Sequence, residues 1–377
     1  MKYVIFSQSF ASCWNHGNAH FLRGIARELL QRGHEVIGYE PANGWSRGNL
    51  LRDQGETALA EGARVVPGLK ILPYRTGSLD VDAAVQGADA VIVHEWTDPA
   101  VVRSLGEHRK TAGRYLLFFH DTHHRAVSAR DEIEAFDLDG YDGVLAFGEL
   151  LREIYQQRGW GHRVFTWHEA ADTALFHPLP RAKTCDVVWI GNWGDGERDQ
   201  ELREFLLEPV HRLGLAARVH GVRYPQHLQN ELARHGLAYC GWMPNHRVPE
   251  CFASAKATLH IPRQPYVQAL RGIPTIRVFE ALACGIPLVC APWEDVEHLF
   301  PSGCYLSVSN SSETAAALRL LMQDGAFARE ISENGLRAIS ARHTCAHRVN
   351  ELEHIIAQIR PHAAAPAPRA RAHEMAS

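Results

Sequence analysis

Residues 272–292 of the chain read GIPTIRVFEALACGIPLVCAP, and this stretch is the most informative about the fold. Pro274 and Thr275 are typical of a helix start, and Gly285 can end that helix just before the apolar run IPLVCAP. An apolar run of this length predicts a buried strand. A helix followed closely by a buried strand is the repeating unit of a parallel sheet covered by helices.

The same alternation of buried strands and helices extends over both halves of the chain. It is interrupted at residues 167–184 by a proline-containing stretch without a clear period. We therefore predict an α/β protein with two Rossmann-like, doubly wound domains and a cleft at the carboxyl ends of both sheets. The predicted division is a first domain at 1–172, a linker at 173–184, a second domain at 185–345, a C-terminal helix at 346–361 and a disordered tail at 362–377. The predicted strands include YVIF, EVIGYE, ADAVIVHEW, RYLLFFHD and YDGVLAFG, followed by CDVVWIGN, ARVHGVR, AYCGWM, KATLHIPR and IPLVCAP.

The composition argues against several classes of protein. The 377 residues carry a formal net charge of −4, whereas general nucleic-acid binders are usually basic. No apolar run is long enough to span a membrane. The eight cysteines contain no C-x-x-C pair, which argues against a disulfide framework and a zinc site. We therefore expect a protein of the reducing cytoplasm.

The predicted helix within 272–292 offers a binding site for a nucleoside diphosphate. The backbone amides of residues 275–278, those of Thr275 and Ile276 included, lie at the helix N-terminus, where free N–H groups and the helix dipole favour an anion. Arg277 and Glu280 are three residues apart and therefore share one helix face. Arg277 would meet a diphosphate, and Glu280 would accept hydrogen bonds from ribose hydroxyls. The alternative interpretation of this pair is a surface ion pair.

Two further segments of the second half place glycine or arginine at predicted strand ends. The segment IGNWGDGER, residues 190–198, has glycines at 191, 194 and 196 before Arg198. It is similar to the turns that approach phosphates, although an ordinary solvent loop explains the same residues. The spacing is not the G-x-G-x-x-G of dinucleotide-binding domains, which disfavours a dehydrogenase. Arg263, at the end of ATLHIPR, is a further candidate cation.

Two loops of the first half carry histidines after predicted strands. In NHGNAH, residues 15–20, Gly17 permits close backbone approach and His20 could bind or deprotonate a hydroxyl, although a simple turn before a capped helix is the alternative. The segment FFHDTHHR follows a strongly apolar strand, and we expect its His120 and Asp121 to line the cleft. Three histidines and a carboxylate also allow a metal site, but adjacent loop residues rarely face one point.

Four segments, in order along the chain, resemble GT-B glycosyltransferases. TIRVFEALACGIPLV resembles their nucleotide-sugar signature E-A-x-A-x-G-x-P. HEAADTALFHP is similar to the N-G-V-D-x-x-x-F-x-P segment of the large retaining family, and YCGWMPNHRVPECFASAKATLHIP to its G-x-V…L-x-x-x-Y-x-x-A segment. The most similar branch is the CgeB-like (spore-maturation) one, through WNHGNAHFLRGIARELLQRGHEV, WIGNWGDGER and IRVFEALACG. The resemblance extends from about residue 3 to residue 350.

The resemblance implies roles for individual residues. Glu280 would bind the ribose, and Gly241, Trp242 and Met243 would contact the base through their backbone. The remaining correspondences are Gly191, Asn192 and Arg198 with the phosphate-side turn, Gly17 with the glycine loop near the diphosphate, and His120 with the histidine that contacts the donor sugar.

One position departs from the large retaining family. The family has a second glutamate eight residues before the ribose-binding one, and this chain has Gly272 there. Whether the anomeric configuration is retained or inverted therefore stays open. If it is inverted, His20 or Asp121 is the expected base.

We therefore expect a GT-B glycosyltransferase that moves a sugar from a nucleoside-diphosphate sugar to a hydroxyl acceptor. The second domain would bind the donor, the first the acceptor, and Arg198 and Arg277 would stabilise the charge of the leaving group. No metal is expected, because neither D-x-D pair, at 80–82 and 137–139, lies in the donor half. The alternatives are a nucleotide-sugar epimerase on the same fold and a non-catalytic nucleotide-sugar-binding protein.

Overall fold

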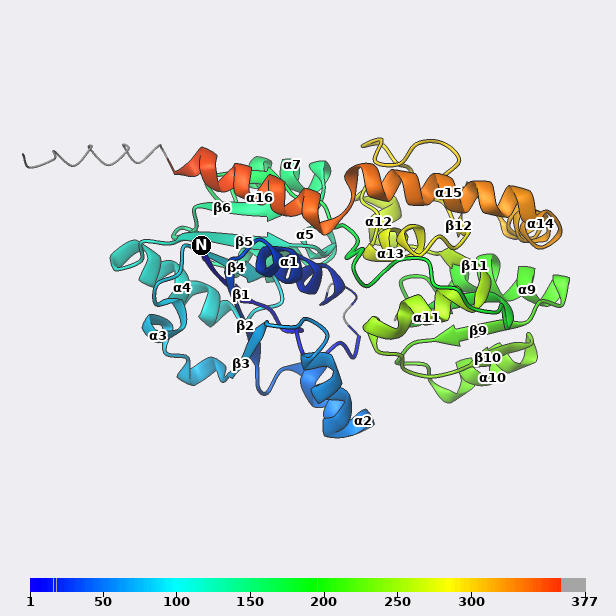
Figure 1. Cartoon of the computed structure of the whole chain (residues 1–377), viewed down its shortest axis with the longest axis horizontal. Coiled ribbons are helices and arrows are strands. Elements are labelled where there is room, and N and C mark those ends of the chain that lie inside the picture. The colour runs from blue at the N-terminus through cyan, green and yellow to red at the C-terminus, as the bar shows by residue number, and fades with distance from the viewer. Residues whose placement is uncertain (16, 18, 195, 361–377) are drawn as a thin grey trace, which may run out of the picture.

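Two parallel sheets covered by helices lie side by side in the computed structural model, which describes residues 1–15, 17, 19–194 and 196–360 (Figure 1). The prediction of two doubly wound, Rossmann-like units is confirmed. The predicted limits of the domains and the linker remain predictions, and the predicted tail at 362–377 falls outside the described residues.

The first sheet has seven strands in the order β3-β2-β1-β4-β5-β6-β7, all of them parallel. The order reverses direction next to β1, which places a crevice at the carboxyl ends of β1 and β4. The strands are β1 (Lys2–Phe6), β2 (Glu35–Pro41), β3 (Lys70–Tyr74), β4 (Ala90–His94), β5 (Leu116–Asp121), β6 (Gly143–Ala146) and β7 (Val164–Thr166). The helices between them are α1 (Ala19–Gln31), α2 (Trp45–Ala63), α3 (Val81–Val85), α4 (Pro99–Thr111), α5 (Arg125–Ser128), α6 (Arg130–Glu134) and α7 (Glu149–Arg158).

The second sheet has six parallel strands in the order β10-β9-β8-β11-β12-β13. Its strands are β8 (Cys185–Ile190), β9 (Ala217–His220), β10 (Leu237–Tyr239), β11 (Ala255–His260), β12 (Leu288–Cys290) and β13 (Leu306–Ser307). The helices are α8 (Asp199–Leu202), α9 (Glu208–Leu213), α10 (Gln226–Arg234), α11 (Val248–Ala253), α12 (Gln264–Gln268), α13 (Ile276–Ala283), α14 (Ser311–Gln323), α15 (Gly325–Arg342) and α16 (Cys345–Ile359).

Burial on both faces of each sheet explains the continuous apolar runs. In β1, Tyr3 and Ile5 pack into the core on one face, and Val4 and Phe6 pack into the core on the other. Because neighbouring side chains of a strand point to opposite faces, a strand covered on both sides must be apolar at every position. No helix in the described part of the chain is long and apolar enough to cross a membrane.

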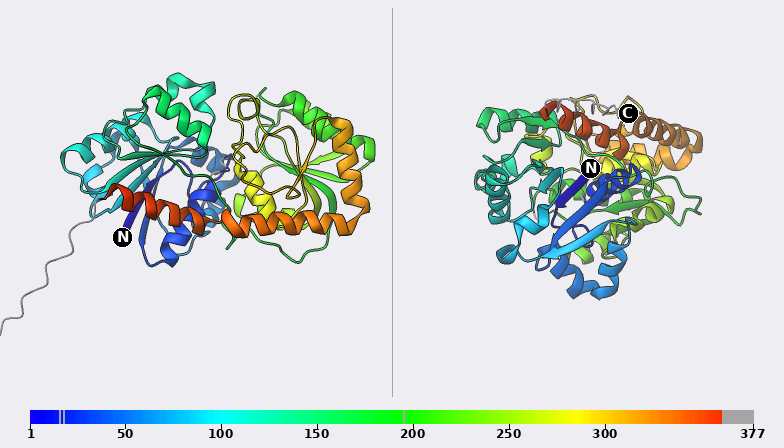
Figure 2. Two further views of the ribbon diagram at one scale, coloured as in Figure 1. Left: turned by 90° about the horizontal axis from the view of Figure 1, so that it is seen from above. Right: turned by 60° about the vertical axis from the view of Figure 1, so that its left-hand side comes forward.

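The C-terminal helices connect the two units. Figures 1 and 2 show α15 along the second unit and α16 returning to the first, where it packs against α1. Arg32, directly after α1, forms an ion pair of 2.8 Å with Glu353 of α16. The chain thus crosses between the units twice, and the two crossings are hydrogen-bonded to each other: Ala171 N–H donates to His343 O at 2.9 Å, and Cys345 N–H donates to Ala171 O at 3.0 Å.

Several elements were not predicted from the sequence. Among them are the edge strands β3, β7 and β13, the helix α2 and the helix α15. The edge strands are short and only partly buried, so they lack the continuous apolar run by which the central strands are identified. Helix α2 is interrupted at Gly55, which has φ +79°, and few of its residues are buried.

Candidate functional site

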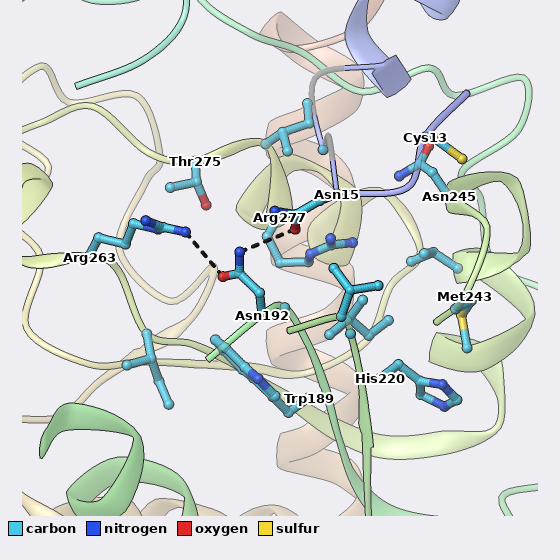
Figure 3. Close-up of a pocket in the computed structure, with 18 of the residues that line it drawn as sticks. Cys13, Asn15, Trp189, Asn192, His220, Met243, Asn245, Arg263, Thr275 and Arg277 are labelled. Carbon is cyan, nitrogen blue, oxygen red and sulfur yellow. Dashed lines mark hydrogen bonds between the residues drawn. The ribbon is translucent and has the colours of Figure 1, made fainter. Parts of the chain in front are cut away.

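A cavity of about 230 Å³ lies between the two units at the carboxyl ends of both sheets (Figure 3). The first unit contributes the loop after β1 and His123, and the second contributes the loops after β8, β9, β10 and β11 and the start of α13. Of the residues expected at the site, Gly17, Gly191, Asn192, Arg198, Trp242, Met243, Arg263, Thr275, Ile276 and Arg277 line the cavity. The others, Gly241, Glu280, His20, His120 and Asp121, do not line it.

Arg198 places a partly buried positive charge on the wall of the cavity. Its guanidinium donates to Ile261 O at 3.1 Å, to Asn192 O at 2.6 Å and to Asn192 Oδ1 at 2.8 Å. Burial, and next the positive charge of Arg263, lower the pKa of Arg198 to about 10. Within the described residues, no carboxylate oxygen lies within 4 Å of this guanidinium. A cation in this position is suited to receive an anionic ligand.

Arg263 and Asn192 extend this polar wall toward the first unit. Arg263 is paired with Glu197 and donates to Asn192 Oδ1 at 3.2 Å. The side-chain amide of Asn192 in turn donates to Asn15 Oδ1 at 3.2 Å, which is a contact between the two units (Figure 3). The residues of the two units therefore form one continuous polar surface.

Fewer backbone N–H groups are free at the start of α13 than the sequence predicts. Val278 N–H donates to Thr275 O at 3.0 Å, and the Ile276 N–H faces the buried carboxyl group of Glu169. The expectation that the amides of residues 275–278 are all free is therefore wrong. Burial, and next the charge of Glu280, raise the pKa of Glu169 well above its usual value.

Thr275 and His260 lie together at the same edge of the cavity. Thr275 Oγ1 is 3.2 Å from His260 Nε2, and both residues line the cavity. Burial, and next the charges of Arg198 and Arg277, lower the pKa of His260 to about 3. The imidazole is therefore neutral at physiological pH. It adds no charge to the arginine-lined wall, which we define as the part of the cavity lined by Arg198, Arg263 and Arg277.

Glu280 lies beneath the cavity wall, not in it. Its carboxylate is fully buried, bonds to Arg277, and accepts a hydrogen bond of 2.8 Å from Asn245 Nδ2. The expectation of direct contact with a ribose is therefore not supported, because Asn245 and Arg277 separate Glu280 from the cavity that they line. The pair with Arg277 is also not a surface ion pair, since the Glu280 side chain is 0% exposed.

The loop predicted to contact the nucleotide base lies at the end of the cavity opposite Arg263 (Figure 3). Trp242 and Met243 line it together with His220, Gly221 and Val222. Gly241, which has φ +72°, turns the chain behind them, and its carbonyl accepts from Gly221 N–H at 2.9 Å. The left-handed backbone at Gly241 favours glycine there.

In the first unit, Gly17 lies close to the start of α13, whereas His20 lies away from the cavity. A Cβ on Gly17 would lie 3.0 Å from Ile276 Cγ2, so a side chain there would press on the start of α13. His20 is 1% exposed, accepts from Asp172 N–H at 2.9 Å through Nε2, and lies 3.3 Å from Glu280 through Nδ1. A base role for His20 is therefore wrong on geometry, because the ring faces the core and not the cavity.

His120 and Asp121 are also turned away from the cavity. His120 is 0% exposed and packs between the rings of Phe21, Trp167 and His94, and burial lowers its pKa to about 3. Asp121 is 0% exposed, and its carboxylate accepts from Tyr155 OH at 2.7 Å. Neither side chain reaches the cavity, which contradicts their expected roles as a sugar contact and a base.

Residues 198–354 match the model of a family described as glycosyl transferase-like. Similar solved structures include sucrose-phosphate synthase of Thermosynechococcus elongatus, which is 12% identical with a TM-score of 0.66 over 95% of this chain and 98% of the synthase. HepE of Anabaena, solved with UDP and glucose, is 15% identical with a TM-score of 0.67 over 95% of this chain and 99% of its own. T4 phage BGT with UDP-glucose is 16% identical, with a TM-score of 0.59 over 95% and 99%, and BGT has also been solved with UDP and Mn²⁺.

The chain has the GT-B fold and carries a glycosyltransferase domain. No curated protein matches the sequence. The family match begins at Arg198 and includes Arg263, Thr275 and Arg277, so most of the arginine-lined wall belongs to the glycosyltransferase domain.

Sequence reasoning missed several residues that line the cavity, and Asn245 and His123 are two of them. Asn245 stands between Glu280 and the cavity, and His123 is contributed by the loop after β5. His123 follows the last strand residue by two positions, and this position just beyond a buried strand is the signal that could have identified it.

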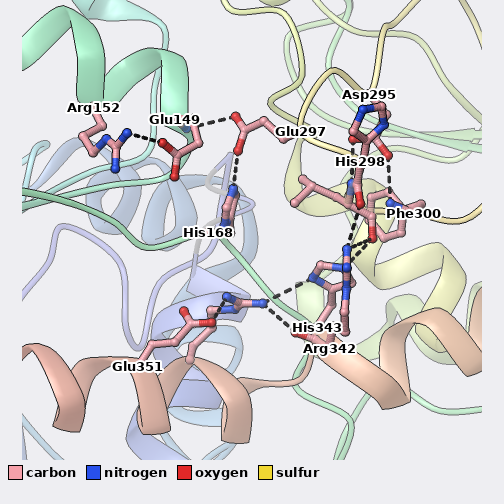
Figure 4. A network of polar contacts seen from close by, with 12 residues as sticks. Glu149, Arg152, His168, Asp295, Glu297, His298, Phe300, Arg342, His343 and Glu351 are labelled. Carbon is pink, nitrogen blue, oxygen red and sulfur yellow. Dashed lines mark hydrogen bonds and ion pairs between the residues drawn. The ribbon is translucent and has the colours of Figure 1, made fainter.

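Gly272, where the large retaining family has a glutamate, has no room for a side chain. It has φ +84°, and a Cβ there would lie 2.5 Å from Val296 Cγ2. The neighbouring Glu297 reaches instead into the first unit, where it accepts from Glu149 N–H at 2.9 Å and bonds to His168 Nε2 at 2.6 Å (Figure 4). The carboxylate closest to this position therefore joins the units and does not line the cavity.

From the sequence we expect no metal, with a metal site in the segment FFHDTHHR as the alternative. The positions of the side chains that could bind a metal bear on this alternative. Within the described residues, no three His, Cys, Asp or Glu side chains are grouped closely enough to hold a metal ion. The three histidines at the end of β5 and in the loop after it have different surroundings: His120 packs in the core, His123 lines the cavity, and His124 contacts Ser128 at 2.7 Å. Metal independence itself remains a prediction.

Proposed function

We propose that this glycosyltransferase transfers a sugar from a UDP-sugar to a hydroxyl acceptor, with the diphosphate of the donor held by Arg198, Arg263 and Arg277. The observation that carries the proposal is Arg198, a partly buried cation on the cavity wall with no carboxylate within 4 Å among the described residues. HepE and T4 phage BGT have been solved with UDP, which supports uridine as the base.

The proposed reaction is a displacement at the anomeric carbon. The acceptor oxygen forms a bond to that carbon, the bond from the carbon to the diphosphate oxygen breaks, and the acceptor loses its proton. UDP leaves with the electron pair, and the three arginines stabilise the negative charge that develops on it. We propose that they do so without a metal ion, because three cations already converge on one wall of the cavity.

Calorimetry with UDP, uridine, GDP and ADP tests the donor site. We expect UDP to bind, uridine to bind more weakly because it lacks the diphosphate, and GDP and ADP to bind more weakly than UDP. A chain that binds none of the nucleoside diphosphates would overturn the proposal.

Incubation with UDP-sugars alone separates the two alternative functions. We expect slow release of UDP, since water can replace the acceptor. A sugar that changes configuration while it stays attached to UDP would support the epimerase. Tight UDP-sugar binding without turnover, with or without a panel of hydroxyl acceptors, would support the non-catalytic protein.

We further propose that the chain belongs to the CgeB-like branch, has its acceptor side at 1–172 and its donor side at 185–345, and acts in the cytoplasm. The segments at 14–36 and 189–198 support the branch, and the positions of the two sheets support the division. The eight free cysteines, seven of them buried, support a reducing compartment. Cell fractionation tests the location.

A further inference from the structure

The cavity contains imidazoles but, among the described residues, no carboxylate that lines it. A hydroxyl acceptor must give up its proton as its oxygen bonds to the sugar, and a positioned side chain usually takes that proton. The expected bases, His20 and Asp121, are buried behind the wall. The imidazoles that line the cavity are those of His123, His220 and His260.

Two of these three imidazoles belong to the donor side. His260 lies 3.2 Å from the hydroxyl of Thr275 at the start of α13, next to the proposed diphosphate position. His220 ends β9 and lies with Val222 and Trp242 at the end of the cavity proposed for the nucleotide base of the donor. Burial lowers the pKa of His260 to about 3 and that of His220 to about 4. Both residues belong to the second sheet, which is the side proposed for the donor.

His123 alone of the three belongs to the first unit, and Asp121 holds its loop in place. Asp121 Oδ1 accepts from the backbone N–H of His123 at 3.0 Å, and the other oxygen of Asp121 accepts from Tyr155 OH at 2.7 Å. The His123 ring packs edge-on against Trp96, with ring centres 5.1 Å apart, and Arg125 covers the same tryptophan. A side chain held in this way is preorganised for catalysis.

We infer that His123 is the catalytic base that takes the proton of the acceptor, an inference that rests on the proposed transfer from a UDP-sugar. As the acceptor oxygen bonds to the anomeric carbon, its proton passes to the imidazole of His123, and the bond between the anomeric carbon and the diphosphate breaks. UDP carries the released electron pair to the arginine-lined wall. Asp121 is then a positioning residue, which holds the loop of His123 and does not touch the substrate.

The test compares His123→Ala with wild type in the release of UDP from a UDP-sugar, with water as the acceptor. Loss of general base catalysis commonly lowers turnover by roughly 100-fold or more. We expect that loss in kcat, an unchanged affinity for UDP, and partial recovery of turnover when imidazole is added to the variant. The matched control is His162→Ala, because His162 is exposed and remote from the cavity lining.

Each outcome decides the inference. Turnover close to that of wild type, or a loss that added imidazole does not restore, would overturn the role of His123. His120→Ala should not respond to imidazole, since its ring lies in the core, and a response there would transfer the role to His120. Failure of the proposed function is separate, because it would appear as absent UDP binding or absent UDP release in the wild-type protein.

Discussion

Glu280 and Asn245 are joined by a hydrogen bond of 2.8 Å between Glu280 Oε1 and Asn245 Nδ2, and only Asn245 reaches the cavity. Glu280 also bonds to Arg277, so one buried carboxylate holds two of the side chains that line the cavity. Its influence on a nucleotide is therefore indirect, through the positions of Asn245 and Arg277.

We expect Glu280→Ala to destabilise the fold as well as weaken UDP binding. The substitution leaves Arg277 and Asn245 without their shared acceptor, and breaking a buried ion pair costs about 3–5 kcal/mol. Urea unfolding measures the loss, and Glu280→Gln should lose less, since it retains one acceptor oxygen. Unchanged stability with reduced UDP affinity would instead support the direct contact with ribose that the sequence predicted.

Arg198→Ala should weaken the binding of UDP and leave that of uridine nearly unchanged. Hydrogen bonds to charged groups are worth about 1.5–3 kcal/mol, which corresponds to roughly 10- to 150-fold in affinity. Calorimetry with both ligands measures the difference. Arg234→Ala is the control, because Arg234 is exposed on α10 and outside the cavity lining. An equal loss for uridine would contradict the assignment to the diphosphate.

The stability of the protein should depend on pH through His120. Its folded-state pKa of about 3 lies below the ordinary value of 6.5, so the unfolded chain binds a proton at a higher pH than the folded chain does. His120 therefore makes its full contribution to the free energy of unfolding above pH 6.5, and this contribution is lost as pH falls toward 3. One such group contributes a difference of about 2 kcal/mol in the free energy of unfolding between pH 7 and pH 5. His120→Phe should therefore lose less stability than wild type over this interval, as measured by urea unfolding. An equal loss in both proteins would show that His120 is not the titrating group.

Gly272→Ala should destabilise the protein more than Gly236→Ala. The two glycines have nearly the same backbone conformation, with φ +84° and +82°, but a Cβ at 272 meets Val296 whereas one at 236 meets nothing within 4 Å. The backbone strain is shared, and overpacking adds about 1–3 kcal/mol at position 272 alone. Thermal unfolding of both variants measures the difference. Equal effects would mean that the Val296 loop moves aside freely, and Gly272→Glu would then be tolerated.

Activity should persist in excess EDTA, without stimulation by added Mg²⁺ or Mn²⁺. Arg198, Arg263 and Arg277 supply positive charge where other transferases use a divalent ion. The measurement is the rate of UDP release before and after chelation. Loss of activity that a divalent ion restores would contradict the arginine-based mechanism.

The residues that sequence patterns identify correctly lie at the junctions of strands and helices. Arg198, Arg263 and Thr275 each stand near a strand end or a helix start, where position along the chain is enough to place a side chain at the carboxyl edge of the sheet. The order of strands and helices can likewise be predicted, because a strand buried on both faces requires a continuous apolar run.

The residues that sequence patterns misplace are those whose direction depends on packing. His120 and Asp121 are the last two residues of β5, and their side chains enter the buried layers on either face of the sheet, which the sequence pattern alone does not state. Glu280 lies on a helix that is buried almost all round, and no local pattern states which face meets the cavity. The return of α16 to the first unit is also invisible in its apolar spacing, because that spacing indicates a buried face but not its partner.

The hydrogen bonds between Ala171 and the segment around Thr344 restrict how the two units can move. If the units were joined by a single tether, they could rotate in any direction and slide past each other. Two crossings held together at one place act as one hinge, so the easiest motion is a rotation about an axis through them. Such a rotation separates Asn15 from Asn192 and opens the cavity while α1 and α16 stay in contact. Entry of a ligand into the cavity and its exit can therefore share a single movement.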